Sequence, residues 1–157
     1  MEQNILRNLD ACAIQQYQAN RYPWFFLDII TEVKPGSYAK GYKNFTYNEW
    51  FFPPHFADNP IVPGFILAES LVQVFIMSFL TLEGNEGAIA TDLSSSSSRF
   101  LLEVKPGDRL DIEANLYSYN RGVAKGEAVG RVGSKVAVSA NYVVAIPSIL
   151  KKYLPKA

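Results

Sequence analysis

One long apolar run dominates the pattern of hydrophobic and polar positions along the chain. It reads "GFILAESLVQVFIMSFLTL" over residues 64–82, and the turn-forming "EGNEG" follows it. The run is longer than an ordinary strand, so we expect a helix here. A helix that is apolar on nearly all sides is either a membrane span or the centre of a soluble core. Polar residues, Glu69 among them, interrupt the run and no basic cluster flanks it, which favours the core.

Shorter segments on both sides of this helix have the composition and alternation of strands. The strand-like segments are 22–33, 37–47, 87–104, 109–120 and two stretches within 121–146 that the turn "VGSK" joins into a hairpin. The prolines of 51–60 make that segment irregular. Five serines at 94–98 are typical of a flexible linker, but a long loop inside a domain is unusual, so we expect a strand.

These elements predict an α+β fold in which a curved antiparallel sheet wraps around the long helix. The length of 157 residues fits one domain, 1–157, with a sizeable core. Helical spacing of apolar residues within 5–17 predicts an N-terminal helical extension over 1–20. Residues 147–157 are expected to form a C-terminal tail.

Composition and charge exclude several functional classes. Hydrophobic residues make up 48% of the chain and charged residues 19%, which indicates a globular protein. Basic and acidic residues balance at 15 each, so bulk charge favours no nucleic-acid partner. The one cysteine, Cys12, allows neither an intramolecular disulfide nor a cysteine-rich zinc site. With an N-terminus that does not resemble a signal peptide, this is compatible with a cytoplasmic protein.

The candidate chemistry lies in "HFADNPIVPGFILAESLVQ", residues 55–73, which begins with the only histidine. His55 is a natural general base near neutral pH. Two prolines lead to Gly64 at the start of the helix, where unpaired N–H groups and the positive end of the helix dipole stabilise an enolate oxygen. The absent side chain of Gly64 lets a substrate approach its N–H closely.

Glu69 and Gln73 lie four residues apart and share one face of the helix. A carboxyl group in an apolar wall tends to have a raised pKa and can deliver a proton, and Gln73 can orient it. A base, an acid and an oxyanion donor suit the removal of a proton next to a carbonyl and the loss of a β-hydroxyl. Each feature also has a purely structural interpretation: a packed histidine, a satisfied polar pair and a helix entry.

The same stretch resembles the signature of the bacterial (3R)-hydroxyacyl-(acyl carrier protein) dehydratases. The resemblance rests on His55-Phe56, the pair Pro60 and Pro63 with Gly64, and Glu69 followed by Gln73. It extends over about residues 20–146 through "RYPWFFLDIITEV", "KNFTYNEWFF" and "SRFLLEVKPGDRLDIEANL". The chain departs from the family pattern at Pro53-Pro54 and Ala57-Asp58, which leaves the acyl substrate and the pathway open, from fatty-acid to specialised acyl or polyketide biosynthesis.

The resemblance implies a hot-dog fold and a homodimer, or three such dimers together, with each active site shared between two chains. In that family His55 would take the C2 proton, Gly64 N–H would hold the thioester oxygen, and Glu69 from the other chain would help the hydroxyl leave. Gln73 would orient the acid, and Phe56 and Pro63 would contribute to substrate binding. The implied partner is acyl carrier protein, which carries the substrate on its phosphopantetheine arm, with no metal and no diffusible cofactor.

Two alternatives remain at this stage. One is a hot-dog acyl thioesterase, which would release free thiol, and the other is a catalytically silent subunit that binds acyl carrier protein without turnover. Acyl carrier protein is acidic, so basic residues near the tunnel mouth are expected to dock it. Arg99, Lys105 and Arg121 are the candidates.

Overall fold

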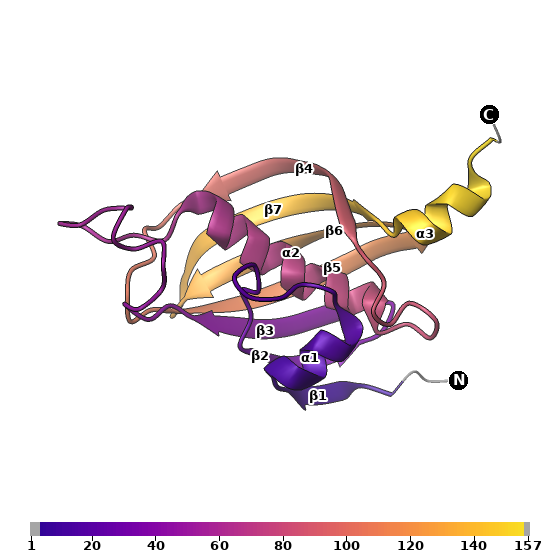
Figure 1. The fold of residues 1–157 in the computed structure, drawn as a ribbon, viewed down its shortest axis with the longest axis horizontal. Coiled ribbons are helices and arrows are strands. Elements are labelled where there is room, and N and C mark those ends of the chain that lie inside the picture. The colour runs from indigo at the N-terminus through magenta and orange to yellow at the C-terminus, as the bar shows by residue number, and fades with distance from the viewer. Residues whose placement is uncertain (1–3, 156–157) are drawn as a thin grey trace.

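A computed structural model describes residues 4–155, apart from the side chains of Ser95 and Ser96 (Figure 1). Residues 1–3 of the predicted extension and 156–157 of the predicted tail lie outside the described residues. The elements in chain order are β1 (Leu6–Leu9), α1 (Ala11–Tyr17), β2 (Ile29–Lys34), β3 (Tyr38–Asn44), α2 (Gly64–Leu80), β4 (Thr91–Phe100), β5 (Arg109–Asn120), β6 (Val123–Val132), β7 (Lys135–Ala145), α3 (Pro147–Leu150) and a 3-10 turn (Lys151–Tyr153).

One seven-stranded antiparallel sheet forms the body of the protein, in the order β1-β2-β3-β5-β6-β7-β4. Helix α2 and strand β4 separate β3 from its sheet neighbour β5 along the chain, so the helix crosses the face of the sheet (Figure 1). Strand β4 lies at one edge and pairs with β7. The predicted sheet wrapped around one central helix is therefore confirmed.

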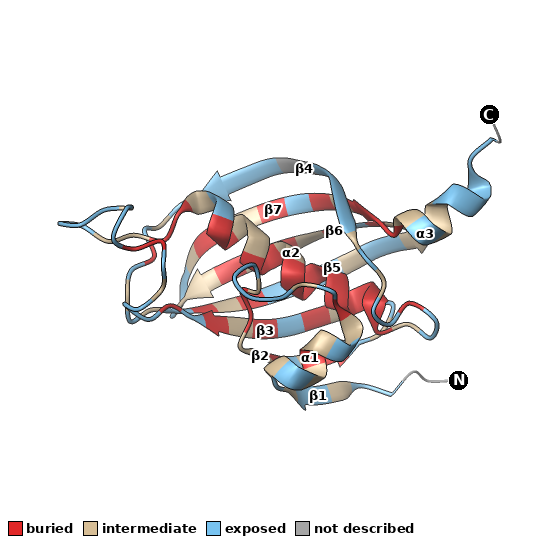
Figure 2. Cartoon of the chain, viewed as in Figure 1, coloured by how far each residue is buried: buried red, intermediate tan, exposed pale blue. Residues whose placement is uncertain are grey.

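Helix α2 is buried along almost its whole length, and its contacts reach β2, β3, β5, β6 and β7 (Figure 2). Its serine side chains find partners within the helix: Ser70 Oγ donates to Ile66 O at 2.9 Å and Ser78 Oγ to Phe75 O at 2.6 Å. Such internal bonds remove the cost of burying a hydroxyl group. No helix among residues 4–155 is long and apolar enough to cross a membrane.

The N-terminal segment differs from the prediction. Residues 6–9 form strand β1, which pairs with β2, and the helix begins only at Ala11. Asp10 caps that helix by accepting a hydrogen bond from Ala13 N at 2.8 Å. The prediction of one helix over 5–17 was wrong in its first half, because Leu6 pairs with Val33 and Leu9 with Ile30 in the sheet, and this pairing outweighed the helical spacing.

The strand predictions around the serine run and the hairpin are confirmed. Residues 94–98 lie inside β4, although bulges break its register with β7 (Figure 2 shows this strand largely exposed). The β6–β7 hairpin turns at Gly133, which adopts a positive φ of 58°, a conformation that glycine reaches without strain. The C-terminal tail contains α3 and the 3-10 turn.

Candidate active site

His55 stands on a loop that closes on itself. Its backbone N–H donates to Phe52 O at 3.1 Å, and its carbonyl accepts from Ile61 N at 2.9 Å. Between these points Phe56 and Asn59 exchange two backbone hydrogen bonds, each of 3.2 Å. Phe52 is fully buried, so the loop is anchored in the core immediately before the histidine. The irregular segment expected from its prolines is confirmed.

The imidazole of His55 is held through one ring nitrogen. Nδ1 lies 3.0 Å from the carbonyl oxygen of Ile61. A carbonyl oxygen only accepts, so Nδ1 carries the proton in this contact. Nε2 of the neutral ring is then left unprotonated and can accept a proton. The ring of Phe56 stacks on the imidazole with centroids 4.4 Å apart, and Phe56 itself remains exposed.

His55 faces a cavity of about 400 Å³ at the N-terminus of helix α2. The lining residues are His55, Ile61, Val62, Gly64, Leu67 and the segment Phe100–Val104. Pro63 caps the helix start without a side-chain bond, and its carbonyl accepts from Ile66 N at 2.9 Å. The N–H of Gly64, at the first helical position, has no carbonyl within the helix to reach. The histidine and the helix N-terminus therefore share one apolar cavity.

The ring of Phe100 lies directly against Gly64. A Cβ atom placed on Gly64 would come within 3.1 Å of Phe100 Cε1 and 3.2 Å of Cζ. Phe100 is about half exposed and forms part of the cavity wall. Only glycine leaves both the aromatic ring and a substrate room beside the helix N-terminus.

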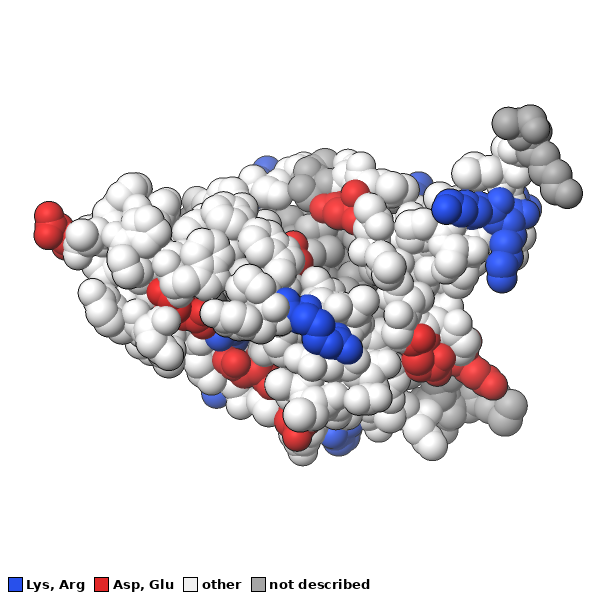
Figure 3. All heavy atoms as spheres, viewed as in Figure 1, with Lys and Arg blue, Asp and Glu red and all other residues white. Residues whose placement is uncertain are grey.

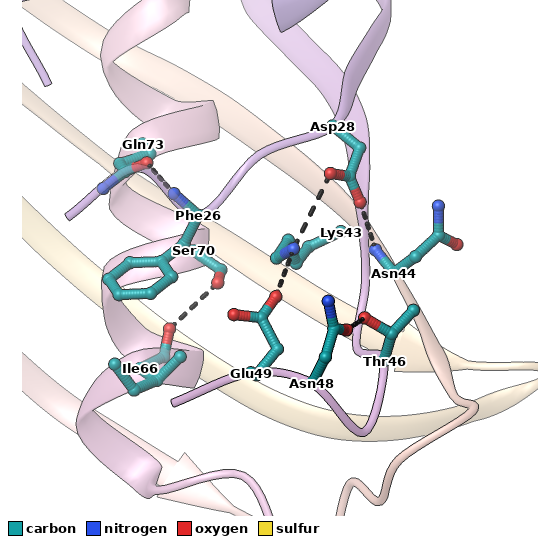
Figure 4. Close-up of polar contacts among 10 residues, drawn as sticks. All are labelled: Phe26, Asp28, Lys43, Asn44, Thr46, Asn48, Glu49, Ile66, Ser70 and Gln73. Carbon is teal, nitrogen blue, oxygen red and sulfur yellow. Dashed lines mark hydrogen bonds and ion pairs between the residues drawn. The ribbon is translucent and has the colours of Figure 1, made fainter. Parts of the chain in front are cut away.

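Glu69 belongs to a second polar cluster. Gln73 Nε2 donates to Glu69 Oε1 at 2.8 Å and to Trp24 O at 3.0 Å, while Gln73 Oε1 accepts from Phe26 N at 2.8 Å (Figure 4 shows the Phe26 contact). Gln73 is fully buried, and these partners fix the orientation of its amide. The predicted hydrogen bond from Gln73 to Glu69 is therefore present. The same amide also holds the segment that leads into β2.

Burial raises the pKa of the Glu69 carboxyl group. Hydrogen bonds from Gln73 and the Trp24 side chain lower the pKa by a smaller amount, and the nearby Asp92 carboxylate raises it. The pKa of Tyr142 is also raised, first by burial and then by Asp92 and Glu69. The Tyr142 hydroxyl donates to Ala68 O at 2.7 Å, immediately before Glu69 in the helix. A proton is therefore held more firmly on Glu69 than on an exposed glutamate.

Sequence reasoning missed Asp92 and Tyr142. Asp92 lies opposite Val144 in the β4–β7 ladder, and Val144 points into the core. Opposite residues of a ladder point to the same face, so Asp92 is directed toward the helix although it is exposed at the sheet edge. The period-two pattern of β7 signals that Tyr142 faces inward, but only the pairing register reveals that Asp92 joins it.

The predicted site residues thus form two groups. His55 and Gly64 line the cavity, Phe56 stacks on the His55 ring, and Pro63 immediately precedes Gly64. Glu69 and Gln73 lie in the second cluster and are not among the cavity-lining residues. Gly64 and Glu69 are five residues apart, so they point about 140° apart around the helix. The histidine and the acid of this chain therefore belong to separate groups. Within residues 4–155, no cluster of histidine, cysteine and acidic residues has the arrangement of a metal site.

The three candidate docking residues lie in different places. Lys105 is beside the cavity: its Nζ is 3.5 Å from Asn59 Oδ1 in the histidine loop and 3.5 Å from Glu103 Oε2. Arg99 precedes Phe100 on the exposed edge strand. Arg121 follows β5 at its far end and covers the ring of Tyr153 at 5.4 Å, close to the basic residues that Figure 3 shows at the C-terminal segment. Of the three candidates, Lys105 therefore lies beside the cavity, and Arg99 is the sequence neighbour of the lining residue Phe100.

Comparison with known proteins gives a consistent result. Residues 19–141 match the model of the FabA-like domain family. The chain is 41% identical over 138 residues to the 3-hydroxyacyl-[acyl-carrier-protein] dehydratase FabZ of Bacillus pumilus, covering 88% of this chain and 96% of the relative. It is 40% identical over 132 residues to the protein of that name from Bacillus licheniformis, covering 84% and 92%. Among solved structures, a chain of the dehydratase heterocomplex ApeI:P from Xenorhabdus doucetiae has a similar fold, with a TM-score of 0.74, 17% identity, and coverage of 91% and 97%.

Proposed function

The chain belongs to the FabA-like family and is a dehydratase of the FabZ type, and from this premise we propose that it converts a (3R)-hydroxyacyl thioester on acyl carrier protein to the trans-2-enoyl thioester and water. The observation that carries this proposal is the cavity shared by His55 and Gly64. His55 and Gly64 both line this largely apolar space. These are the groups that removal of a proton next to a thioester carbonyl requires.

In the proposed reaction, His55 Nε2 takes the proton from C2, and the electron pair moves into the thioester carbonyl. The N–H of Gly64 and the dipole of helix α2 stabilise the resulting enolate oxygen. The C3–O bond then breaks as the enolate collapses, and protonated Glu69 donates its proton so that the hydroxyl leaves as water. The raised pKa of Glu69 suits this role because the group must hold a proton near neutral pH.

The acid that serves each cavity comes from a second copy of the chain. Glu69 is not among the residues that line the His55 cavity, which supports a site shared between two copies. Apolar side chains are exposed near the helix N-terminus, and Trp24 stacks on Phe65 there at 6.1 Å. A group of exposed aromatic side chains of this kind marks a protein-contact surface. The unpaired edge of β4 offers a second place where a copy can add.

The substrate arrives on acyl carrier protein, and the residues of the chain itself supply the base, the acid and the oxyanion donor. No metal or diffusible cofactor is needed, because the reaction moves a proton and water without a net change in oxidation state. Lys105, beside the cavity, supplies positive charge for an acidic carrier.

The test is an assay with a (3R)-hydroxyacyl thioester that measures the conjugated enoyl product and free thiol separately. We expect enoyl product from the parent protein, and a loss of about 100-fold or more in His55→Ala and in Glu69→Gln. Arg121→Ala, far from the cavity, is the matched control and should retain activity. Full activity in either site variant would refute the mechanism. Free thiol as the main product would indicate a thioesterase, and carrier binding without turnover would indicate a silent subunit.

A further inference from the structure

Lys43 is a buried cation next to the loop that carries the histidine. Only 9% of this residue is exposed. Its Nζ lies 2.7 Å from Glu49 Oε1 and 3.6 Å from Asp28 Oδ1 (Figure 4). The ammonium group also lies over the ring of Phe45, 5.8 Å from its centroid. Lysine is almost never buried without a charged partner, so this residue depends on the two carboxylates.

Glu49 lies in the middle of a series of consecutive turns, here called the ladder of turns, that runs from Thr46 to His55. Glu49 N donates to Thr46 O at 3.1 Å, Phe52 N to Glu49 O at 3.3 Å, and His55 N to Phe52 O at 3.1 Å. Each bond spans three residues, so any shift of Glu49 along this path passes directly to His55. The side chain of Thr46 also donates to Asn48, which tightens the first turn.

The other partner of Lys43 is fixed independently of the histidine loop. Asp28 Oδ2 accepts a hydrogen bond from Asn44 N at 2.6 Å, which ties it to the end of strand β3. Two residues earlier, Phe26 N is held by Gln73 (Figure 4). Lys43 therefore joins Glu49, in the histidine loop, to a frame built from the sheet and helix α2.

Because Lys43 is buried, its ion pair with Glu49 strongly opposes any displacement of Glu49. Moving Glu49 away would leave a desolvated ammonium group with only the longer contact to Asp28, which costs far more than breaking a surface pair. The exposed pair of Lys40 and Glu113 illustrates the contrast, with a separation of 3.8 Å and side chains 47% and 58% exposed. Apolar packing of Phe52 holds the histidine loop in the core. The ion pair between Lys43 and Glu49 fixes the position of the loop relative to strand β3.

We propose that Lys43 and Glu49 are positioning residues for His55. They hold the ladder of turns so that Nδ1 stays on the carbonyl of Ile61 and Nε2 points into the cavity. The kinetic part of this inference rests on the proposed function, whereas the orientation of the imidazole can be measured without any substrate.

The experiment uses the single histidine as its own probe. In the full-length protein, ¹⁵N correlation spectra of the imidazole report its tautomer directly, because the chain has no other histidine. We expect the Nδ1–H tautomer in the parent and a mixture of tautomers in Lys43→Met. In the same variant kcat should fall about 10- to 100-fold with little change in KM, because a displaced base slows the chemical step.

Lys40→Met, on the same strand, is the matched control and should leave both the tautomer and kcat unchanged. If Lys43→Met does not fold, Glu49→Gln removes the charge with little change in volume, and the same shift of tautomer is expected. A folded variant of Lys43 or Glu49 with the parent tautomer overturns the inference, and so does an equal loss of kcat in Lys40→Met. If the parent protein does not dehydrate the thioester, the proposed function fails, and the tautomer alone still decides the positioning role.

Discussion

Gln73 holds Glu69 through a 2.8 Å hydrogen bond while its own amide is fixed by the backbone of the segment before β2. The proposed acid is therefore oriented by a side chain that cannot rotate without breaking contacts elsewhere. Gln73 therefore contributes both to the orientation of Glu69 and to the stability of the fold.

Gln73→Leu should lower both stability and activity. The change leaves Phe26 N–H and Trp24 C=O without their partner, and unsatisfied buried groups cost about 1–3 kcal/mol each. We expect a loss of about 2–4 kcal/mol in the free energy of unfolding, measured by urea denaturation, and a lower kcat. Gln16→Leu on the exposed face of α1 is the control. An unchanged denaturation midpoint in Gln73→Leu would contradict the role of the amide.

Glu69→Gln should stabilise the fold more as the pH rises. The ordinary pKa of a glutamate is 4.5, and burial raises the pKa of Glu69 in the folded state. The folded state then binds the proton more tightly than the unfolded chain does. The contribution of Glu69 to stability is fully present below pH 4.5 and is lost as the pH rises through the raised folded-state pKa.

Glutamine stays neutral, so the difference in Tm between variant and parent should be small at pH 4 and positive at pH 8. Thermal melts across this range check the sign. Glu83→Gln, at an exposed position after α2, should show no such trend. A constant difference in Tm at all pH values would show that the pKa of Glu69 is not raised.

Asp92→Asn should move the alkaline limb of the pH–rate profile to lower pH. The negative charge of Asp92 raises the pKa of Glu69, so its removal lets Glu69 lose its proton at a lower pH. The measurement is kcat/KM against pH, with Asp111→Asn on β5 as the control. A shift of this limb to higher pH would rule out Asp92 as a source of the effect.

Gly64→Ala should separate activity from stability. The new methyl group meets the ring of Phe100 at about the closest tolerable distance and narrows the space beside the Gly64 N–H. Alanine also favours a helix more than glycine does. We expect kcat/KM to fall about 10- to 100-fold while Tm changes little. Phe100→Leu in the same chain relieves the crowding and should restore part of the activity.

Mixed dimers test whether two copies share each site. His55→Ala and Glu69→Gln are expected to be inactive separately. Random exchange of the two variant chains makes about half of the dimers mixed, and each mixed dimer has one intact site, so about a quarter of parent activity should return. Mixing is measured after mild denaturation and refolding of equal amounts. No recovery despite mass-spectrometric proof of mixed dimers would place base and acid in the same chain.

The sequence was most informative where a pattern had one physical solution. The apolar run after Pro63 and Gly64 is too long for a strand, and helix α2 begins at the predicted residue. The turn at Gly133 requires a residue that tolerates positive φ, and both flanking strands follow from it. Gln73 four residues after Glu69 predicted their hydrogen bond through helix geometry alone.

The remaining features depend on partners far away in the sequence. Strand β1 exists because Leu6 pairs with Val33, which local spacing does not reveal. Lys43 reads as an ordinary surface lysine until the fold brings Asp28 and Glu49 around it. The separation of Glu69 from the cavity likewise follows from the rotation of the helix relative to the loop, which sequence motifs do not specify.

The place of β4 in the sheet has a consequence for biosynthesis. Strand β4 is synthesised directly after helix α2, but β7, with which β4 pairs, is the last strand of the chain. Nascent β4 therefore remains unpaired during the synthesis of β5 and β6, while helix α2 still lacks its contacts with β5, β6 and β7. Waiting strands are prone to aggregate when they are hydrophobic, and the serines at 94–98 lower that tendency. The serine run thus leaves this late-pairing strand polar before the chain has folded.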